Sequence, residues 1–231
     1  MRKGTKQLKI ENRFLRNFRF ILGFILVLLI IAGLFGFIFK TLSDPTRYDY
    51  ATENGVFHIT KEIINGVNIY SASVFADGIE YVHHFRYHPE ELEEVYLEPE
   101  IKNLLNRPEG LKRLYITRPY DIDEKDAVNF VIAMSSFGQI LGTSQAGIYK
   151  TPIVSAYTVY TDESIPDSLK TRIPKAGCSN VDNETAVILL VITESTRVIS
   201  ESHECIIIEG KNSEEVIKAA EKFGYHLLGM F

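Results

Sequence analysis

The sequence contains one long stretch that lacks charged and strongly polar side chains altogether, between Phe20 and Phe39. Its 20 residues would reach about 30 Å as an α-helix, which matches the thickness of the hydrocarbon core of a bilayer. A helix satisfies its own backbone hydrogen bonds, as the interior of a membrane requires. The absence of charge therefore predicts a transmembrane helix over residues 20–39, with the lipid bilayer as its partner.

Acidic side chains are almost missing from the first 40 residues. This segment contains one acidic residue, Glu11, and eight Lys and Arg residues, so its net charge is +7. The remaining residues carry 17 basic and 29 acidic side chains, a net charge of −12. Seven of the eight basic residues precede the apolar stretch, which favours a cytoplasmic N-terminus and a C-terminal domain outside the cell membrane. A domain this acidic repels phosphate backbones, which argues against nucleic acid as its partner.

The sequence also lacks the signals of common processing routes. The segment FKTLSDPT after the apolar stretch has no A-x-A cleavage site, and no cysteine follows that would carry a lipoprotein anchor. An uncleaved signal anchor is the main prediction, and a cleaved signal peptide and a buried core helix are the alternatives. The expected organisation is a basic cytoplasmic tail (1–19), a single-pass transmembrane helix (20–39), a spacer (40–53) and an extracytoplasmic domain (54–231).

Cysteine is scarce, with Cys178 and Cys205 as the only two in the chain. In an oxidising outer compartment they can form a disulfide, which would stabilise the fold by roughly 3–4 kcal/mol on the loop-entropy model. If the domain faced inward, both would be free thiols. The sequon Asn183-Glu184-Thr185 lies in a predicted loop, so Asn183 is a candidate glycosylation site on the outer side.

The first part of the domain alternates apolar and polar residues, as half-buried strands do. Strands are expected over three segments: 55–60, 67–70 and 79–87. The pairs Asn65-Gly66 and Asp77-Gly78 between them are typical of hairpin turns. The simplest interpretation is an antiparallel meander of three strands.

The second part of the domain mixes strands and helices. The expected elements are a strand over 112–118, a helix over 123–142, a strand over 151–160, a polar loop over 161–184, a buried strand over 185–193, strand segments within 197–209 and a final helix over 213–231. Asp123 is the expected N-cap of the first helix, and Asn212 with Glu215 opens the last. This order predicts an α+β (mixed α/β) domain with one twisted, mainly antiparallel sheet and two main helices.

Three histidines in the third predicted strand suggest a metal site. On a strand, however, His83 points away from His84, and His84 and His88 lie about 13 Å apart, too far to share one Zn²⁺. In a helix they would form an i, i+4 pair, but the Glu that a zinc-protease motif needs does not follow His84. Histidines on the strand surface are the expected interpretation.

Other candidate chemistry also has a structural explanation. Asp121, Asp123 and Asp126 resemble a calcium loop, but Lys125 stands where an oxygen ligand is needed, so helix capping is expected. The segment GTSQA around Ser144 resembles a nucleophile elbow, yet it follows a helix and ends in Ala. The sequence therefore predicts no catalytic residue, no cofactor and no metal site.

Seven segments follow one another at distinctive spacings: GVFHI at 55–59, GV at 66–67, FRYHPEE at 85–91, Cys178, the apolar strand 186–192, CIIIEG at 205–210 and the last helix over 220–229. In this arrangement most of residues 50–231 resembles an uncharacterised family of archaeal single-pass membrane proteins. The resemblance implies an N-terminal anchor, an extracytoplasmic domain and a disulfide, and it implies no activity. The final FGYHLLG departs from that family, which often has a basic residue and Leu-Leu-Tyr before the last Gly.

The function expected from these features is a membrane-anchored extracytoplasmic binding or assembly module of the cell envelope, with an unknown envelope protein as partner. It follows from a strong anchor and a compact domain without a catalytic motif. The alternative is a membrane-tethered enzyme with an unrecognised site. A concave pocket that gathers His83, His84, Glu80 or Asp121 would favour the enzyme.

Overall fold

The computed structural model describes residues 25, 27–33, 46–105, 110–158, 173–201 and 205–231. The chain divides into two compact units, residues 1–45 and 46–231, and each is described by itself. In the first unit, residues 25 and 27–33 are helical and exposed. No helix in the described part of the chain combines the length and the apolar character that a membrane crossing needs. The predicted basic tail, most of the predicted transmembrane helix and the first part of the predicted spacer, residues 40–45, lie outside the described residues.

The first sheet of the domain is an antiparallel meander of four strands in the order β1-β2-β3-β4. The strands are β1 (Arg47–Thr52), β2 (Gly55–Ile64), β3 (Val67–Ala76) and β4 (Ile79–Phe85). Both predicted hairpin turns are present: Asn65 and Asp77 have φ values of 52° and 51°, and the following glycines have 79° and 77°. The meander is therefore confirmed, and β1 adds a strand where the sequence suggested a spacer.

The second sheet has six strands in the order β5-β9-β10-β8-β6-β7. These are β5 (Tyr96–Leu97), β6 (Arg113–Pro119), β7 (Ile153–Thr158), β8 (Thr185–Ile192), β9 (Arg197–Glu201) and β10 (Cys205–Gly210). Neighbouring strands run parallel, except that β9 and β10 run antiparallel. Strand β8 lies inside the sheet, as its continuous apolar sequence predicted.

The prediction of one mainly antiparallel sheet was wrong, whereas the α+β class and the two main helices are confirmed. The chain forms two separate sheets, and the second is mainly parallel. The physical reason is the strand–helix–strand unit β6–α2–β7, because a helical crossover returns the chain in the direction of the first strand. Strand β8 then adds on the other side of β6, also parallel to it.

The main helices are α2 (Glu124–Leu141) and α4 (Ser213–Leu227), and the short 3₁₀ helices are η1 (Pro89–Leu92), η2 (Ile101–Leu105) and η4 (Cys178–Asn180). Both predicted N-caps are present. The Asp123 carboxylate accepts the backbone N–H of Asp126 at 2.8 Å. The Asn212 side chain accepts the N–H groups of Glu214 and Glu215 at 3.1 and 3.0 Å. Each cap satisfies donors that the first helical turn leaves free.

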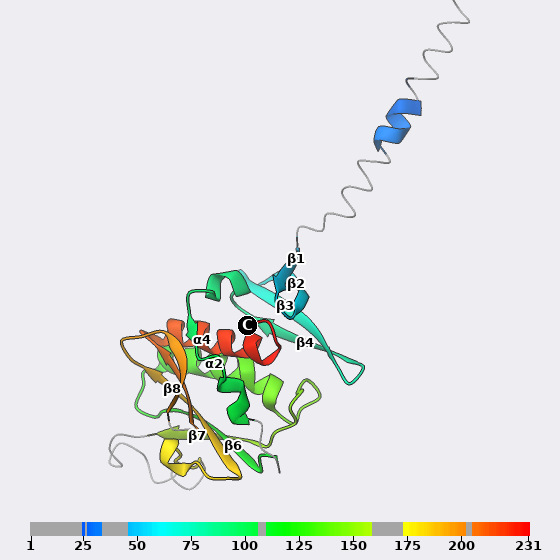
Figure 1. The fold of residues 1–231 in the computed structure, drawn as a ribbon. Helices are drawn as coiled ribbons and strands as arrows, with labels where there is room; N and C mark the ends of the chain where they lie inside the picture. The colour runs from blue at the N-terminus through cyan, green and yellow to red at the C-terminus, as the bar shows by residue number, and fades with distance from the viewer. Residues whose placement is uncertain (1–24, 26, 34–45, 106–109, 159–172, 202–204) are drawn as a thin grey trace, which may run out of the picture. The chain divides into compact units, whose positions relative to one another are not determined.

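Helices α2 and α4 run side by side between the two sheets, so the domain has three layers (Figure 1). Because α4 has a sheet on each side, it is buried around almost its whole circumference rather than along one face. On the meander side, the Phe85 ring stacks on Tyr225 with centroids 3.8 Å apart. On the α2 side, the Phe137 ring packs edge-on against Phe223. One core therefore connects all three layers.

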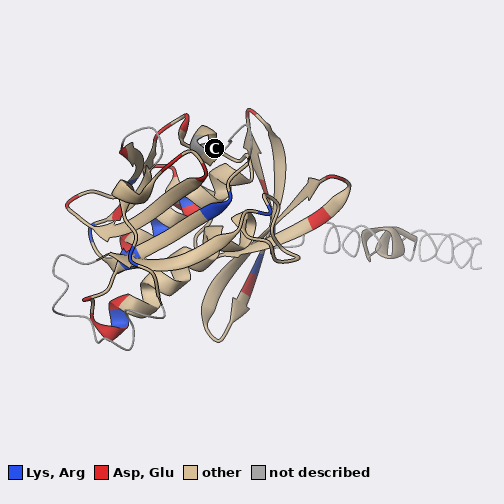
Figure 2. Ribbon diagram, turned by 90° about the horizontal axis from the view of Figure 1, so that it is seen from below, with Lys and Arg blue, Asp and Glu red and all other residues tan. Residues whose placement is uncertain are grey.

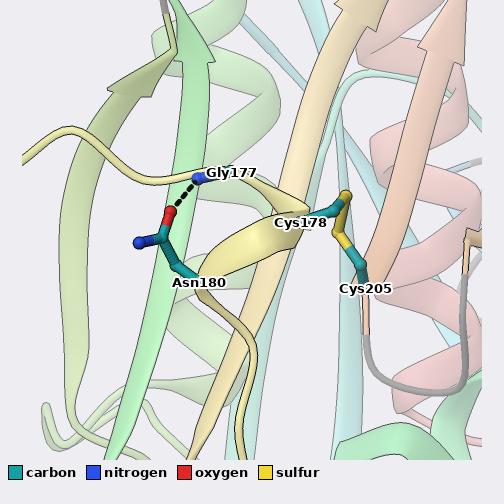
Figure 3. Close-up of a disulfide and its surroundings, with 4 residues drawn as sticks. All are labelled: Gly177, Cys178, Asn180 and Cys205. Atoms are coloured by element: carbon teal, nitrogen blue, oxygen red, sulfur yellow. Dashed lines mark hydrogen bonds between the residues drawn. A yellow bond between two sulfur atoms is a disulfide. The ribbon is translucent and has the colours of Figure 1, made fainter.

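The predicted disulfide between Cys178 and Cys205 is present, with Cα atoms 5.3 Å apart (Figure 3). It joins η4 to the start of β10. Because strand side chains alternate, Cys205 and its neighbour Ile207 point away from the core cluster that contains Ile206. The disulfide therefore ties the segment around η4 to the face of the second sheet that the two main helices leave uncovered.

Acidic residues lie mostly in turns and connecting segments, and the strands are largely uncharged (Figure 2). The predicted glycosylation residue, Asn183, is exposed in a turn between Asp182 and Thr185, which form an antiparallel bridge. Its exposure is compatible with modification, which stays a prediction.

Candidate functional site

The candidate site is a groove of about 560 Å³ between α2 and the strands β6 and β7. Its wall is formed by side chains of the helix, of the two strands and of the loop after the helix. The lining residues are Ile116, Arg118, Val131, Met134, Ser135, Gly138, Gln139, Gly142, Thr143, Ser144, Ile153 and Ser155. A volume in this range is typical of sites for small ligands.

The groove arises where a parallel strand pair meets one face of a helix. In β6, Ile116 and Arg118 point to the same side as Leu114, which belongs to the core under the helices. The parallel register places Ser155 of β7 beside Ile116. Above them, α2 presents Gly138, where a Cβ atom would lie 3.5 Å from the end of Ile116, an ordinary contact distance.

A second hollow, of about 240 Å³, lies on the other side of α2, next to the meander. Val131, Ser135 and Gln139 line both hollows. These residues recur every four positions, so they form one ridge along the helix. Val131 and the preceding Val128 are exposed on this ridge. Helix α2 thus presents a ridge that is apolar at Val128 and Val131 and polar at Ser135 and Gln139, with a depression on each side.

The chemistry of the groove is simple, because Arg118 is the only ionisable side chain among the described residues that line it. The Arg118 guanidinium donates to the backbone carbonyl of Pro119 at 3.0 Å, which uses one of its five N–H donors. Hydroxyls at Thr143, Ser144 and Ser155 line the same wall. The described lining residues include no carboxylate and no imidazole that could transfer a proton. The arrangement is suited to hold an apolar body and one anionic group.

The residues that would have favoured an enzyme are not gathered in one cavity. His83 is buried and faces the core, whereas His84 points to the opposite side of the strand, where its ring shares a 2.8 Å hydrogen bond with Ser71. Glu80 lines a hollow over the meander, and Asp121 is exposed before α2. The strand alternation predicted the separation of the two histidines.

The other candidates also lie apart. His88 has left the strand and caps η1, with its ring packed among those of Tyr48, Tyr50 and Tyr70. Among the residues that the structure describes, no group of three or more His, Cys, Asp or Glu is placed to hold a metal ion. Ser144 follows a helix, as its sequence context indicated, and its carbonyl accepts from Lys150.

Helix α4 contains two buried charged side chains that the sequence analysis missed, and one of them, Glu221, binds the turn after β4. The Glu221 carboxylate accepts the backbone N–H groups of Arg86 and Tyr87 at 2.9–3.0 Å, and burial raises its pKa to about 7. Burial lowers the pKa of Lys222 to about 8, and its ammonium lies 3.3 Å from the centre of the Phe231 ring. Charged residues inside an apolar helix were the available signal. The contacts of Glu221 with backbone N–H groups and of Lys222 with the Phe231 ring indicate that both side chains have a structural role.

No protein-family model, no curated protein and no solved structure matches this chain. The resemblance to archaeal single-pass proteins therefore stays a hypothesis, and the function is argued from the geometry of the domain.

Proposed function

We propose that this chain is a membrane-anchored extracytoplasmic binding module that holds a ligand with an apolar body and one anionic group in the α2 groove. The observation that carries the proposal is the described lining of the groove, in which aliphatic side chains and hydroxyls surround one cation, Arg118. In a largely apolar site, one guanidinium orients a carboxylate or phosphate, while the aliphatic wall contributes affinity.

The anchor is the apolar stretch over residues 20–39. Its described part includes Ile25, Leu29 and Ile31, all of them exposed, whereas aliphatic side chains of the domain are mostly buried. Lipid would cover such side chains. The basic residues before the stretch favour a cytoplasmic N-terminus. An outer, oxidising compartment is consistent with the disulfide between Cys178 and Cys205.

The test of the ligand class uses the full chain in lipid nanodiscs and a pair of probes, 2-naphthoate and its neutral amide, by equilibrium dialysis against empty nanodiscs. We expect saturable binding of naphthoate. Arg118→Gln should weaken naphthoate binding at least tenfold, because a hydrogen bond to a charged group contributes about 1.5–3 kcal/mol. Binding of the neutral amide should stay within a factor of about two, since it depends on the apolar wall.

The matched control is Arg113→Gln on the same strand. Arg113 points to the opposite face of the sheet from Arg118, where its guanidinium donates to the Tyr115 hydroxyl. This variant removes the same charge from the domain without changing the groove. Equal losses in both variants, or no naphthoate binding above that of empty nanodiscs, would contradict the proposed ligand class.

A further inference from the structure

The hairpin between β2 and β3 carries exposed aliphatic side chains on both of its faces. Ile63, Ile64 and Val67, around the Asn65-Gly66 turn, are 69%, 51% and 41% exposed. Ile64 pairs with Val67, so these two share one face, while Ile63 points to the other. A hairpin that only extends a half-buried sheet would be polar on its solvent side. Apolar residues on both faces are suited to a tip that enters an apolar medium. The hairpin around Asp77 also exposes Phe75 and Ile79, so the place where the chain enters the domain decides between that tip and the β2–β3 tip.

This tip lies at the end of the sheet where the chain enters the domain. Arg47, at the start of β1, pairs with Thr60, and the Lys61 backbone N–H donates to the Thr46 carbonyl at 2.6 Å. From Thr60 the hairpin continues for four more residues of β2, which span about 13 Å. The turn at Asp77, by contrast, closes the opposite end of the sheet.

The tether between the anchor and the domain is short. Six residues separate Phe39 from Thr46 in the sequence. The seven peptide steps between these two residues reach at most about 25 Å. The headgroup layer between the hydrocarbon core and water takes up about 5–8 Å of this distance. The length that remains, at most about 20 Å, limits how far the β1 end of an anchored domain can lie from the headgroup layer.

We propose that the β2–β3 hairpin docks on the lipid surface, with Ile63, Ile64 and Val67 inserted into the interfacial region next to the anchor. The proposal rests on the membrane anchoring argued above and adds a second contact with the same bilayer. Lys61 and Glu62 beside the tip offset each other in charge. Docking at the tip therefore depends on insertion of apolar side chains and not on attraction between charges.

The test places an environment-sensitive bimane label at Ile64→Cys in the full chain, in phosphatidylcholine nanodiscs with and without doxyl-labelled lipid. The control label is at Phe75→Cys, which is also exposed, at 75%, and lies near the opposite end of the sheet. Because Cys178 and Cys205 are paired, only the new thiol reacts when no reductant is present. We expect doxyl lipid to quench the Ile64 label at least threefold more than the Phe75 label, and aqueous iodide to show the reverse order.

Equal iodide quenching at both positions, with no quenching by doxyl lipid, would overturn the proposal. A label at Val67→Cys repeats the test if the Ile64 variant does not fold. Alkaline carbonate extraction of native membranes distinguishes failure of the hairpin proposal from failure of the membrane anchor. A chain that is retained but has an aqueous Ile64 label disproves hairpin docking alone. A chain that is extracted disproves the anchor and, with it, both proposals.

Discussion

At the scale of single residues, His83 is the least satisfied group in the described core. Its side chain is 1% exposed, and neither ring nitrogen has a hydrogen-bond partner in the structure. Burial, with a smaller effect of the neighbouring His84, lowers its pKa from 6.5 to about 4. A neutral imidazole is therefore part of the folded state, and protonation favours the unfolded chain.

His83 should make the domain sensitive to acid. Its folded pKa lies below its unfolded value, so its contribution to stability is fully present above about pH 6.5 and is lost as the pH falls toward 4. His83→Leu should remove this loss. Between pH 8 and pH 5 we expect the variant to gain about 2 kcal/mol of unfolding free energy relative to the wild type, measured by urea unfolding and circular dichroism.

The difference between variant and wild type is the informative quantity, because Glu221 acts in the opposite direction. Its raised pKa, about 7, makes its contribution fall as the pH rises from about 4.5 to 7. That contribution is common to both proteins and cancels in the difference. Stability profiles that stay parallel from pH 8 to pH 5 would show that His83 is not the acid-sensitive group.

At the scale of elements, the central helix α4 depends on small residues where it meets its neighbours. Ala219, Ala220 and Gly224 are buried in it. A Cβ atom at Gly224 would lie 2.9 Å from the Phe85 ring and 3.5 Å from Ile140 of α2. Gly224 is thus a point at which α4 lies close to both α2 and the meander.

Gly224→Ala should destabilise the domain by about 1–3 kcal/mol, because the Phe85 ring is stacked on Tyr225 and has little room to move. The matched control is Gly138→Ala in α2. There the nearest atom to the new methyl group would be the end of Ile116 at 3.5 Å, an ordinary contact. That variant should be neutral or gain up to about 1 kcal/mol from helix propensity. Equal unfolding free energies for the two variants would contradict the close approach at Gly224.

At the scale of the whole molecule, the disulfide ties the η4 segment to the start of β10 in the second sheet. Cys178 and Cys205 are separated by 27 residues, and the β8 and β9 strands lie within this loop. The bond acts mainly on the unfolded chain, whose conformational freedom it restricts. It also connects stability to the compartment, because only an oxidising environment maintains it.

Reduction of the disulfide should lower the unfolding free energy of the domain by about 3–4 kcal/mol, as expected for a loop of this length. Urea unfolding with and without dithiothreitol measures the effect. The double variant Cys178→Ser, Cys205→Ser should have the lower stability under both conditions and should not respond to the reductant. An unchanged midpoint after complete reduction of the wild type would contradict this prediction.

Local features could be predicted because neighbouring residues alone decide them. The Asp123 and Asn212 caps, the Asn65-Gly66 turn and the opposite faces of His83 and His84 all follow from short-range sterics and hydrogen bonding. The two cysteines could be paired from their scarcity and the expected compartment. The distribution of basic residues before the apolar stretch 20–39 and of acidic residues after it can likewise be read from the sequence, and it predicts an anchor without knowledge of the fold.

The site could not be predicted, because it depends on which strands become neighbours. Arg118 and Ser155 are 37 positions apart in the sequence. They line the same groove only because β6 and β7 pair in parallel and α2, which connects these two strands, packs over them. Glu221 can be buried because the backbone N–H groups of residues 86 and 87, which belong to another layer of the domain, donate hydrogen bonds to its carboxylate.

By itself, then, the sequence determined most of the helices and strands, though not β1 and β5, together with the helix caps, the hairpin turns, the separation of charge and the pairing of the cysteines, since each depends on local pattern or composition. Only the tertiary structure decided that there are two sheets with α4 between them, and where the groove lies. These features depend on contacts between residues that are far apart in the chain. Such contacts stabilise the protein only once the core has packed, so no single segment of the sequence specifies them.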